Sequence, residues 1–183
     1  FMESFEAHWG VPGGILQTII GSQLRDRDFP CPPRIRHELH LDEKGMVILY
    51  EIEPKNETMP IVLLAHGMGG CSESGYMKRI STKLWMQGYG VFLINHLGCG
   101  PGMGLSARLW NGGSSDDLEQ MVAFVIQRYP NALLMPIGFS LSGNILLKYL
   151  GEGRSIPSGL IGAMAINPPV DLRVASHIIS THR

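Results

Sequence analysis

One short segment, residues 138–143, restricts the fold of this chain more than any other. Its sequence, Gly-Phe-Ser-Leu-Ser-Gly, follows an apolar run at 133–137 and precedes a helix-forming run at 144–150. This order predicts a strand, a tight turn and a helix, with Ser140 at the apex of the turn. Such a turn lifts the serine hydroxyl above the edge of a sheet, beside the free N–H groups of the first helical turn.

The turn is similar to the Gly-x-Ser-x-Gly pattern of a nucleophile elbow, which makes Ser140 the candidate nucleophile. One position departs from the pattern, because Ser142 stands where the second glycine is expected. Serine is still small enough to let the helix start pass close to the neighbouring strands. An ordinary strand-to-helix turn that contains serine has the same pattern. Evidence from the rest of the chain is therefore needed to distinguish a nucleophile elbow from an ordinary turn.

The order of apolar and amphipathic runs predicts an α/β fold, with a mostly parallel, doubly wound sheet and antiparallel strands at its N-terminal edge. The expected strands are 34–41, 46–53, 61–65, 91–94, 133–137 and 159–166, and the expected helices are 76–87, 114–129 and 144–150. Ser114 and Asp117 have the spacing of a capping box. We expect an N-terminal extension at 1–33 and a partial domain at 34–183, whose sheet stops after its sixth strand.

In sheets of this kind the site lies beyond the carboxyl ends of the strands. The loop 66–70, His-Gly-Met-Gly-Gly, directly follows the strand at 61–65. An acyl-transfer serine needs two N–H donors for the developing oxyanion. We expect these donors to be the backbone amides of Leu141 and Met68. The alternative interpretation of 66–70 is a flexible glycine turn.

Other residues near this sheet edge suit supporting roles. His66 precedes Ser140 in the chain, whereas in hydrolases with this elbow the histidine follows the serine. We therefore expect His66, Gly67 and Asn95 to support the loops rather than to catalyse. Cys99 has no motif of its own and is interpreted as a packed loop residue.

Composition limits the function classes. The formal net charge of −1 does not fit a nucleic-acid binder, and no apolar run is long enough to span a membrane. Cys31, Cys71 and Cys99 are too few and too scattered for a disulfide framework or a metal site, which favours a cytoplasmic protein. The rival fingerprint at 102–107, Gly-x-Gly-x-x-Ala, does not directly follow a strand or open a helix, so we expect no nucleotide and no other cofactor.

These residues, in this order, resemble the YheT-like α/β-hydrolases, also called the embryogenesis-associated hydrolase family. The similar segments are 9–18, 66–70, 95–99, 116–118, 138–152 and 168–172. The resemblance implies a serine esterase or lipase-like enzyme with Ser140 as nucleophile, acting on small-molecule esters with lipid-like esters among the candidates. Two positions depart from the family pattern: Ser142 replaces a glycine, and Leu97 stands where arginine is usual.

The expected catalytic triad is incomplete. After Ser140 the only acids are Glu152 and Asp171, and the only histidines are His177 and His182. In the family the acid and the histidine come from later strands, so the chain looks like an N-terminal part that is inactive by itself, with both residues expected beyond Arg183. A non-catalytic, hydrolase-like binding or scaffold protein, or an inactive fragment, remains the alternative, and nothing in the sequence indicates an oligomeric state.

The loops offer apolar side chains for a substrate pocket. We expect its lining to include Met68, Met103, Leu105, Leu109 and Trp110. Such a lining would favour neutral acyl esters over charged substrates.

Overall fold

The computed structural model describes residues 9–11, 13–14, 16–17, 20, 30, 32–43 and 45–181. The expected extension at 1–33 lies largely outside these residues, as do Cys31 and His182. The strands are β1 (Ile35–Asp42), β2 (Gly45–Ile52), β3 (Ile61–Ala65), β4 (Gly90–Asn95), β5 (Leu134–Phe139) and β6 (Met164–Ile166). The helices are α2 (Gly75–Met86), α3 (Ser115–Arg128), α4 (Leu141–Gly151) and α5 (Leu172–Thr181), with a 3₁₀ turn, η1, at Gly100–Gly102.

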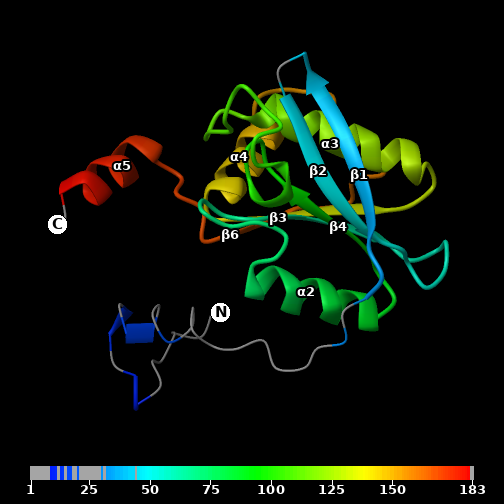
Figure 1. Cartoon of the computed structure of the whole chain (residues 1–183), viewed down its shortest axis with the longest axis horizontal. Helices are drawn as coiled ribbons and strands as arrows, with labels where there is room; N and C mark the ends of the chain where they lie inside the picture. The colour runs from blue at the N-terminus through cyan, green and yellow to red at the C-terminus, as the bar shows by residue number, and fades with distance from the viewer. Residues whose placement is uncertain are drawn as a thin grey trace.

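One mixed sheet organises the described residues, with strand order β1-β2-β4-β3-β5-β6 (Figure 1). Strands β1 and β2 pair antiparallel, and β2 pairs antiparallel with β4. The remaining neighbours, β4 with β3, β3 with β5 and β5 with β6, are all parallel. The expected fold class is therefore confirmed, including the antiparallel strands at the N-terminal edge.

The central strands β3 and β4 are buried at every position and almost entirely apolar, because both faces of the sheet are covered. Ile61 and Leu63 of β3 pack into a core with α3 and α4, whereas Val62 and Leu64 pack into a second core with α2. Figure 1 shows the same layers, with α2 on one face of the sheet and α3 and α4 on the other. The two cores fix the direction of each parallel strand, so the ends of β3, β4 and β5 meet at one edge.

The last strand is shorter than expected. The predicted strand at 159–166 forms a strand only at β6, while Leu160 makes an isolated bridge to Leu134. Met164 is exposed, and Ala165 and Ile166 are partly buried. The apolar run at 159–166 therefore predicted too long a strand. The observed strand is short because β6 lies at the edge of the described sheet and is less buried than β3.

The predicted capping box at the start of α3 does not form. Ser114 occupies the N-cap position, but its hydroxyl accepts a hydrogen bond from the backbone of Asn111, not from the first turn of α3. The carboxylate of Asp117 instead accepts two hydrogen bonds from Arg108, at 2.7 and 3.0 Å. The guanidinium of Arg108, from the loop that precedes α3, therefore binds the carboxylate that the spacing assigned to the cap.

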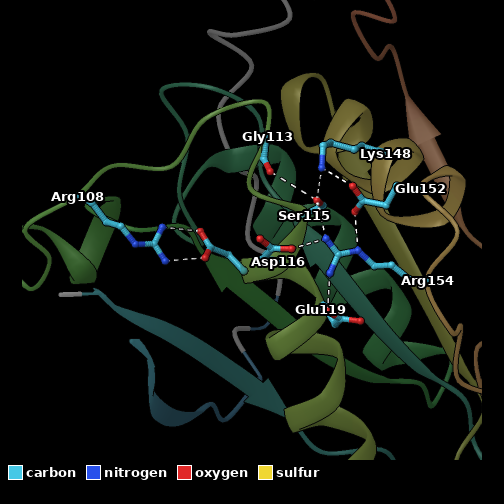
Figure 2. A network of polar contacts seen from close by, with 9 residues as sticks. Arg108, Gly113, Ser115, Asp116, Glu119, Lys148, Glu152 and Arg154 are labelled. Carbon is cyan, nitrogen blue, oxygen red and sulfur yellow. Dashed lines mark hydrogen bonds and ion pairs between the residues drawn. The ribbon is translucent and has the colours of Figure 1, made fainter. Parts of the chain in front are cut away.

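Polar contacts join the start of α3 to the end of α4 (Figure 2). Lys148 donates to the hydroxyl of Ser115, at 2.6 Å, and to the carboxylate of Glu152. Arg154 contacts Asp116 and Glu152. The hydrogen bond from Lys148, with smaller contributions from Ser115 and Arg154, lowers the pKa of the Glu152 carboxyl to about 2. This network fixes α3 against α4 and leaves Glu152 engaged there.

Helix α5 lies apart from the layered domain in Figure 1 and has no buried residue. Val174, Ile178 and Ile179 all expose apolar surface. Asp171 precedes the helix, and its carboxylate accepts the N–H of Val174 at 2.9 Å, which is the contact of an N-cap. Within the described ranges, no helix combines the length and apolar character needed to cross a bilayer.

The two-faced core leads to a stability prediction. Replacing Leu63, which is fully buried in β3, with alanine should lower the free energy of unfolding by about 2–5 kcal/mol, because it removes buried methyl groups and leaves a cavity. Urea unfolding followed by circular dichroism measures the change. Leu133→Ala is the matched control: Leu133 is about half exposed and precedes β5, so a loss as large as that of Leu63→Ala would contradict the assigned core.

Candidate active site

Ser140 lies at the junction of β5 and α4 in strained backbone geometry. Its φ of 52° and ψ of −119° place this non-glycine residue at a positive φ. The turn is so tight that a Cβ on Gly138 would lie 2.5 Å from the carbonyl oxygen of Ser142, which leaves room for glycine alone. The N–H of Ser140 donates to Ile166 at the end of β6, at 2.9 Å, which ties the turn to the sheet. The expected strand-to-helix turn with Ser140 at its apex is therefore confirmed, and the structure shows in addition that its backbone is strained.

A pocket of about 320 Å³ opens beside this serine. Its lining residues are Gly67, Met68, Tyr76, Phe139, Ser140, Ile166 and Asn167. Met68 and Ser140 therefore share one pocket, as expected. Met103, Leu105, Leu109 and Trp110 are not among its lining residues, so that part of the expected lining is wrong. Trp110, for example, stacks flat on the ring of His96, with ring centroids 4.1 Å apart.

The loop after β3 approaches the serine closely. A Cβ on Gly67 would lie 3.1 Å from the Cβ of Ser140 and 3.4 Å from the carbonyl oxygen of Phe139, so the lack of a side chain permits this approach. The carbonyl of Gly67 accepts the N–H of Gly70 at 3.1 Å, which closes the loop into a turn. Met68 stands at the exposed tip of that turn.

Leu141 is the first residue of α4, directly after Ser140. Its N–H belongs to the first turn of the helix, where no preceding turn supplies an acceptor. The N-terminus of a helix also carries partial positive charge. Both features suit a donor to an oxyanion that forms beside Ser140.

The unusual serine of the elbow, Ser142, is buried and joins two loops. Its hydroxyl donates to the carbonyl of His66 and lies 2.7 Å from Nε2 of His96. Because a serine hydroxyl has one hydrogen, and the His66 carbonyl takes it, Nε2 of His96 must carry the proton donated to Ser142. Burial, with a smaller contribution from His66, holds the pKa of His96 well below its usual range and keeps this ring neutral.

Both ring nitrogens of His66 contact the backbone. Nδ1 lies 2.8 Å from the carbonyl oxygen of Gly67 and therefore donates its proton there, while Nε2 accepts the N–H of His96 at 3.3 Å. Burial lowers the pKa of His66. Neither nitrogen of this ring is left to accept a proton from Ser140.

Asn95 and Leu97 lie at the end of β4. The Asn95 side chain accepts the N–H of Ser72 at 2.8 Å and donates to the carbonyl of Ile48 at 3.1 Å, so it links three segments. Leu97, where the resembled family usually has arginine, is buried in the core shared with α3 and α4. This departure therefore adds an apolar core contact instead of a charge beside the pocket.

No general base contacts Ser140 within the described part of the chain. His177 lies on the exposed helix α5, and Asp171 caps that helix. Glu152 is held by Lys148 and Arg154 at the far end of α4. The remaining histidine after the serine, His182, lies outside the described residues.

Other site types find little support in the described ranges. They contain no cluster of three or more His, Cys, Asp or Glu side chains arranged to hold a metal ion. Cys71 and Cys99 are free thiols. Burial raises the pKa of Cys99, which favours the thiol over the reactive thiolate.

Two pocket residues escaped the sequence analysis. Asn167 follows β6 at a φ of 47°, so both non-glycine residues at positive φ within the described part, Ser140 and Asn167, line this one pocket. Asparagine tolerates this conformation, and its position before two prolines was the available signal. The apolar spacing marks Tyr76 only as the start of a helix, although its hydroxyl accepts the N–H of Gly67 at 2.9 Å.

Comparison with known proteins identifies the family to which this sequence is similar. Residues 60–179 match the model of the alpha/beta hydrolase fold. The chain is 33% identical over 153 residues to the monoacylglycerol lipase ABHD2 of Danio rerio, covering 80% of this chain and 35% of that protein. It is 29% identical over 163 residues to abhydrolase domain-containing protein 2 of Drosophila melanogaster, covering 86% of this chain and 40% of that protein. The chain thus spans well under half the length of these curated relatives.

Solved structures agree on the fold. The esterase Pf2001 of Pyrococcus furiosus aligns with a TM-score of 0.64 at 18% identity, covering 82% of this chain and 60% of that one. XC6422 of Xanthomonas campestris, an α/β serine hydrolase without a lid, aligns with a TM-score of 0.55 at 19% identity, covering 68% and 58%. At these identities the likeness concerns the fold alone.

The buried histidines predict a pH dependence of stability. The unfolded chain binds more protons than the folded chain once the pH falls through about 6.5, because burial depresses the pKa values of His96 and His66. The free energy of unfolding should therefore fall between pH 7 and pH 5, by up to about 1.4 kcal/mol per pH unit for each such histidine. Urea unfolding at pH 7, 6 and 5 measures the slope.

Two variants test the origin of that slope. His96→Gln should flatten it, because the variant removes the group that must take up a proton on unfolding. His40→Gln is the matched control, since His40 is exposed on β1 and should leave the slope as it is. Equal slopes for wild type and His96→Gln would show that this histidine does not carry the effect.

Proposed function

This chain belongs to the alpha/beta hydrolase fold family, and we propose that the protein is a carboxylic ester hydrolase that works through an acyl-enzyme on Ser140. The observation that carries the proposal is the strained Ser140 turn, which opens onto a pocket that Met68 also lines. Strained residues cluster at functional sites because the surrounding structure has to hold them there. The relatives named as lipases and the esterase structures support the same reaction class.

The proposed chemistry assigns one role to each residue. The Ser140 hydroxyl attacks the ester carbonyl and forms a tetrahedral oxyanion, for which the backbone N–H groups of Leu141 and Met68 are the proposed donors. Collapse of this intermediate expels the alcohol and leaves an acyl-enzyme, which water then hydrolyses. His66, Gly67 and Asn95 support the loops around this site through the contacts described above.

The proposed reaction also needs a general base for the Ser140 hydroxyl. A serine hydroxyl is a weak nucleophile until a base takes its proton, and the described residues place no histidine on Ser140. We propose that the triad acid and histidine lie outside the described residues. The coverage of 35% of the zebrafish relative and 40% of the fly relative is compatible with this proposal.

Three finer assignments are also proposals. The segments quoted above favour the YheT-like branch of the family. Residues 34–181 form the described part of a hydrolase domain, preceded by an extension at 1–33. The free thiols of Cys71 and Cys99 suit a reducing compartment such as the cytoplasm.

A binding or scaffold role is the second candidate, and the observation that favours it is the exposed apolar surface of α5. Large exposed apolar surfaces mark interaction sites. The two candidates differ in a simple way, because only the enzyme needs the Ser140 hydroxyl.

The first functional prediction concerns Ser140. In the longest natural protein that contains this chain, Ser140→Ala should abolish labelling by a fluorophosphonate probe and lower turnover of a short-chain ester by about 10³-fold or more. Ser106→Ala is the matched control, since the Ser106 hydroxyl bonds to the backbone of Met46 in a pocket away from Ser140. Residues 1–183 alone should label and turn over very poorly, because no described residue of this chain contacts Ser140 as a base. Equal turnover of both forms, lost in each with Ser140→Ala, would place the base within this chain.

The second functional prediction concerns the substrate. Met68, Phe139 and Ile166 give the pocket a largely apolar lining, and none of the described residues that line it is charged. The protein should therefore turn over neutral acyl esters at least about tenfold faster than matched esters that carry a carboxylate on the acyl chain, since burying an unpaired charge is costly. A panel of p-nitrophenyl esters measures the ratio. Turnover of phosphate monoesters without turnover of acyl esters would refute the assignment.

A further inference from the structure

We propose that Tyr76 is a positioning residue of this site, whose hydroxyl holds the loop after β3 so that the Met68 N–H faces the pocket of Ser140. The inference rests on the proposed function, since it concerns the same oxyanion. It adds a side chain from α2, on the face of the sheet opposite the nucleophile's own helix, to a site otherwise built from strand ends and α4.

The first step concerns the peptide group between His66 and Gly67, which is held at both ends. Its carbonyl accepts the hydroxyl of Ser142, and its N–H donates to the hydroxyl of Tyr76 at 2.9 Å. Ser142 belongs to α4 and Tyr76 to α2. The peptide is thus fixed between helices that cover opposite faces of the sheet.

The second step concerns the next peptide group, between Gly67 and Met68. Its carbonyl accepts two hydrogen bonds, from the Gly70 N–H at 3.1 Å and from Nδ1 of His66 at 2.8 Å. A trans peptide is planar, and its N–H points opposite to its C=O. Fixing the carbonyl of Gly67 therefore fixes the direction of the Met68 N–H.

The two steps are coupled through Gly67. Glycine has the widest backbone freedom of any residue, so nothing intrinsic to it keeps the two peptide planes in register. Within the described part of the chain, the hydroxyl of Tyr76 is the one acceptor for the Gly67 N–H. Without that acceptor, the His66–Gly67 plane is held at its carbonyl end alone, and only the two bonds to the Gly67 carbonyl still orient the Met68 N–H.

Tyr76 is itself held in place. Its ring packs edge-to-face against Phe139, with centroids 5.0 Å apart, and it lines the pocket beside Ser140. Burial is the largest cause of a raised pKa for Tyr76, so the hydroxyl stays neutral at physiological pH. A fixed, neutral hydroxyl can hold the loop under the conditions in which an esterase works.

The test uses Tyr76→Phe in the longest natural protein that contains this chain, because this variant keeps the ring contact with Phe139 and removes only the hydroxyl. We expect kcat to fall about tenfold with KM nearly unchanged, since misaligning one donor costs less than the roughly 10²–10³-fold loss on removing it. Affinity for a trifluoromethyl ketone, which forms an oxyanion on the serine, should fall by a similar factor. Hydrogen exchange at the Gly67 amide should quicken.

Tyr129→Phe is the matched control. The Tyr129 hydroxyl donates to the buried carboxylate of Glu51, so its loss should lower stability while kcat and inhibitor affinity stay unchanged. Unchanged kcat and unchanged inhibitor affinity in Tyr76→Phe, with Ser140→Ala inactive, would overturn the role of Tyr76 alone. Full activity in Ser140→Ala would instead refute the proposed function, and unchanged exchange at Gly67 would then overturn the loop contact as well.

Discussion

The structure depends on the burial of β3 and β4 from both sides. Alternate side chains of β3 enter two separate cores, one beneath α3 and α4 and one beneath α2. A strand covered in this way cannot slip by one residue without exchanging its two faces. The register therefore fixes where each strand ends, and the loops that carry His66, Asn95 and Ser140 start from those ends. The geometry of the pocket therefore follows from the core packing, and Tyr76, Phe139 and Ile166 pack against one core while they line the pocket.

Much of this arrangement could be predicted because it is encoded locally. Continuous apolar runs mark β3 and β4, and glycines on either side of Ser140 mark the turn. A Cβ on Gly138 would overlap the backbone of Ser142, so the turn requires the glycine that the elbow pattern has at this position. Where a few neighbouring residues decide the outcome, as at the elbow, sequence reasoning found it.

The errors have a different origin, since each depends on a side-chain contact made across a loop, which neither periodicity nor cap spacing reports. Asp117 had suitable spacing for a cap, but Arg108 reaches it from a loop. Trp110 was expected in the pocket, but it stacks on His96. Tyr76 lies in the first turn of a helix with no unusual spacing, and its hydroxyl accepts the N–H of Gly67 because α2 begins beside the preceding loop. Periodicity carries no information about such partners.

Helix α5 gains little stability from tertiary packing, because none of its side chains is buried. It has ten residues and no buried side chain, and isolated helices shorter than about 12–15 residues are marginal in water. Its capping contact through Asp171 offsets only part of the cost of nucleation. Little within the described residues therefore stabilises α5 as a helix, and a surface that covers Val174, Ile178 and Ile179 would raise its helical population.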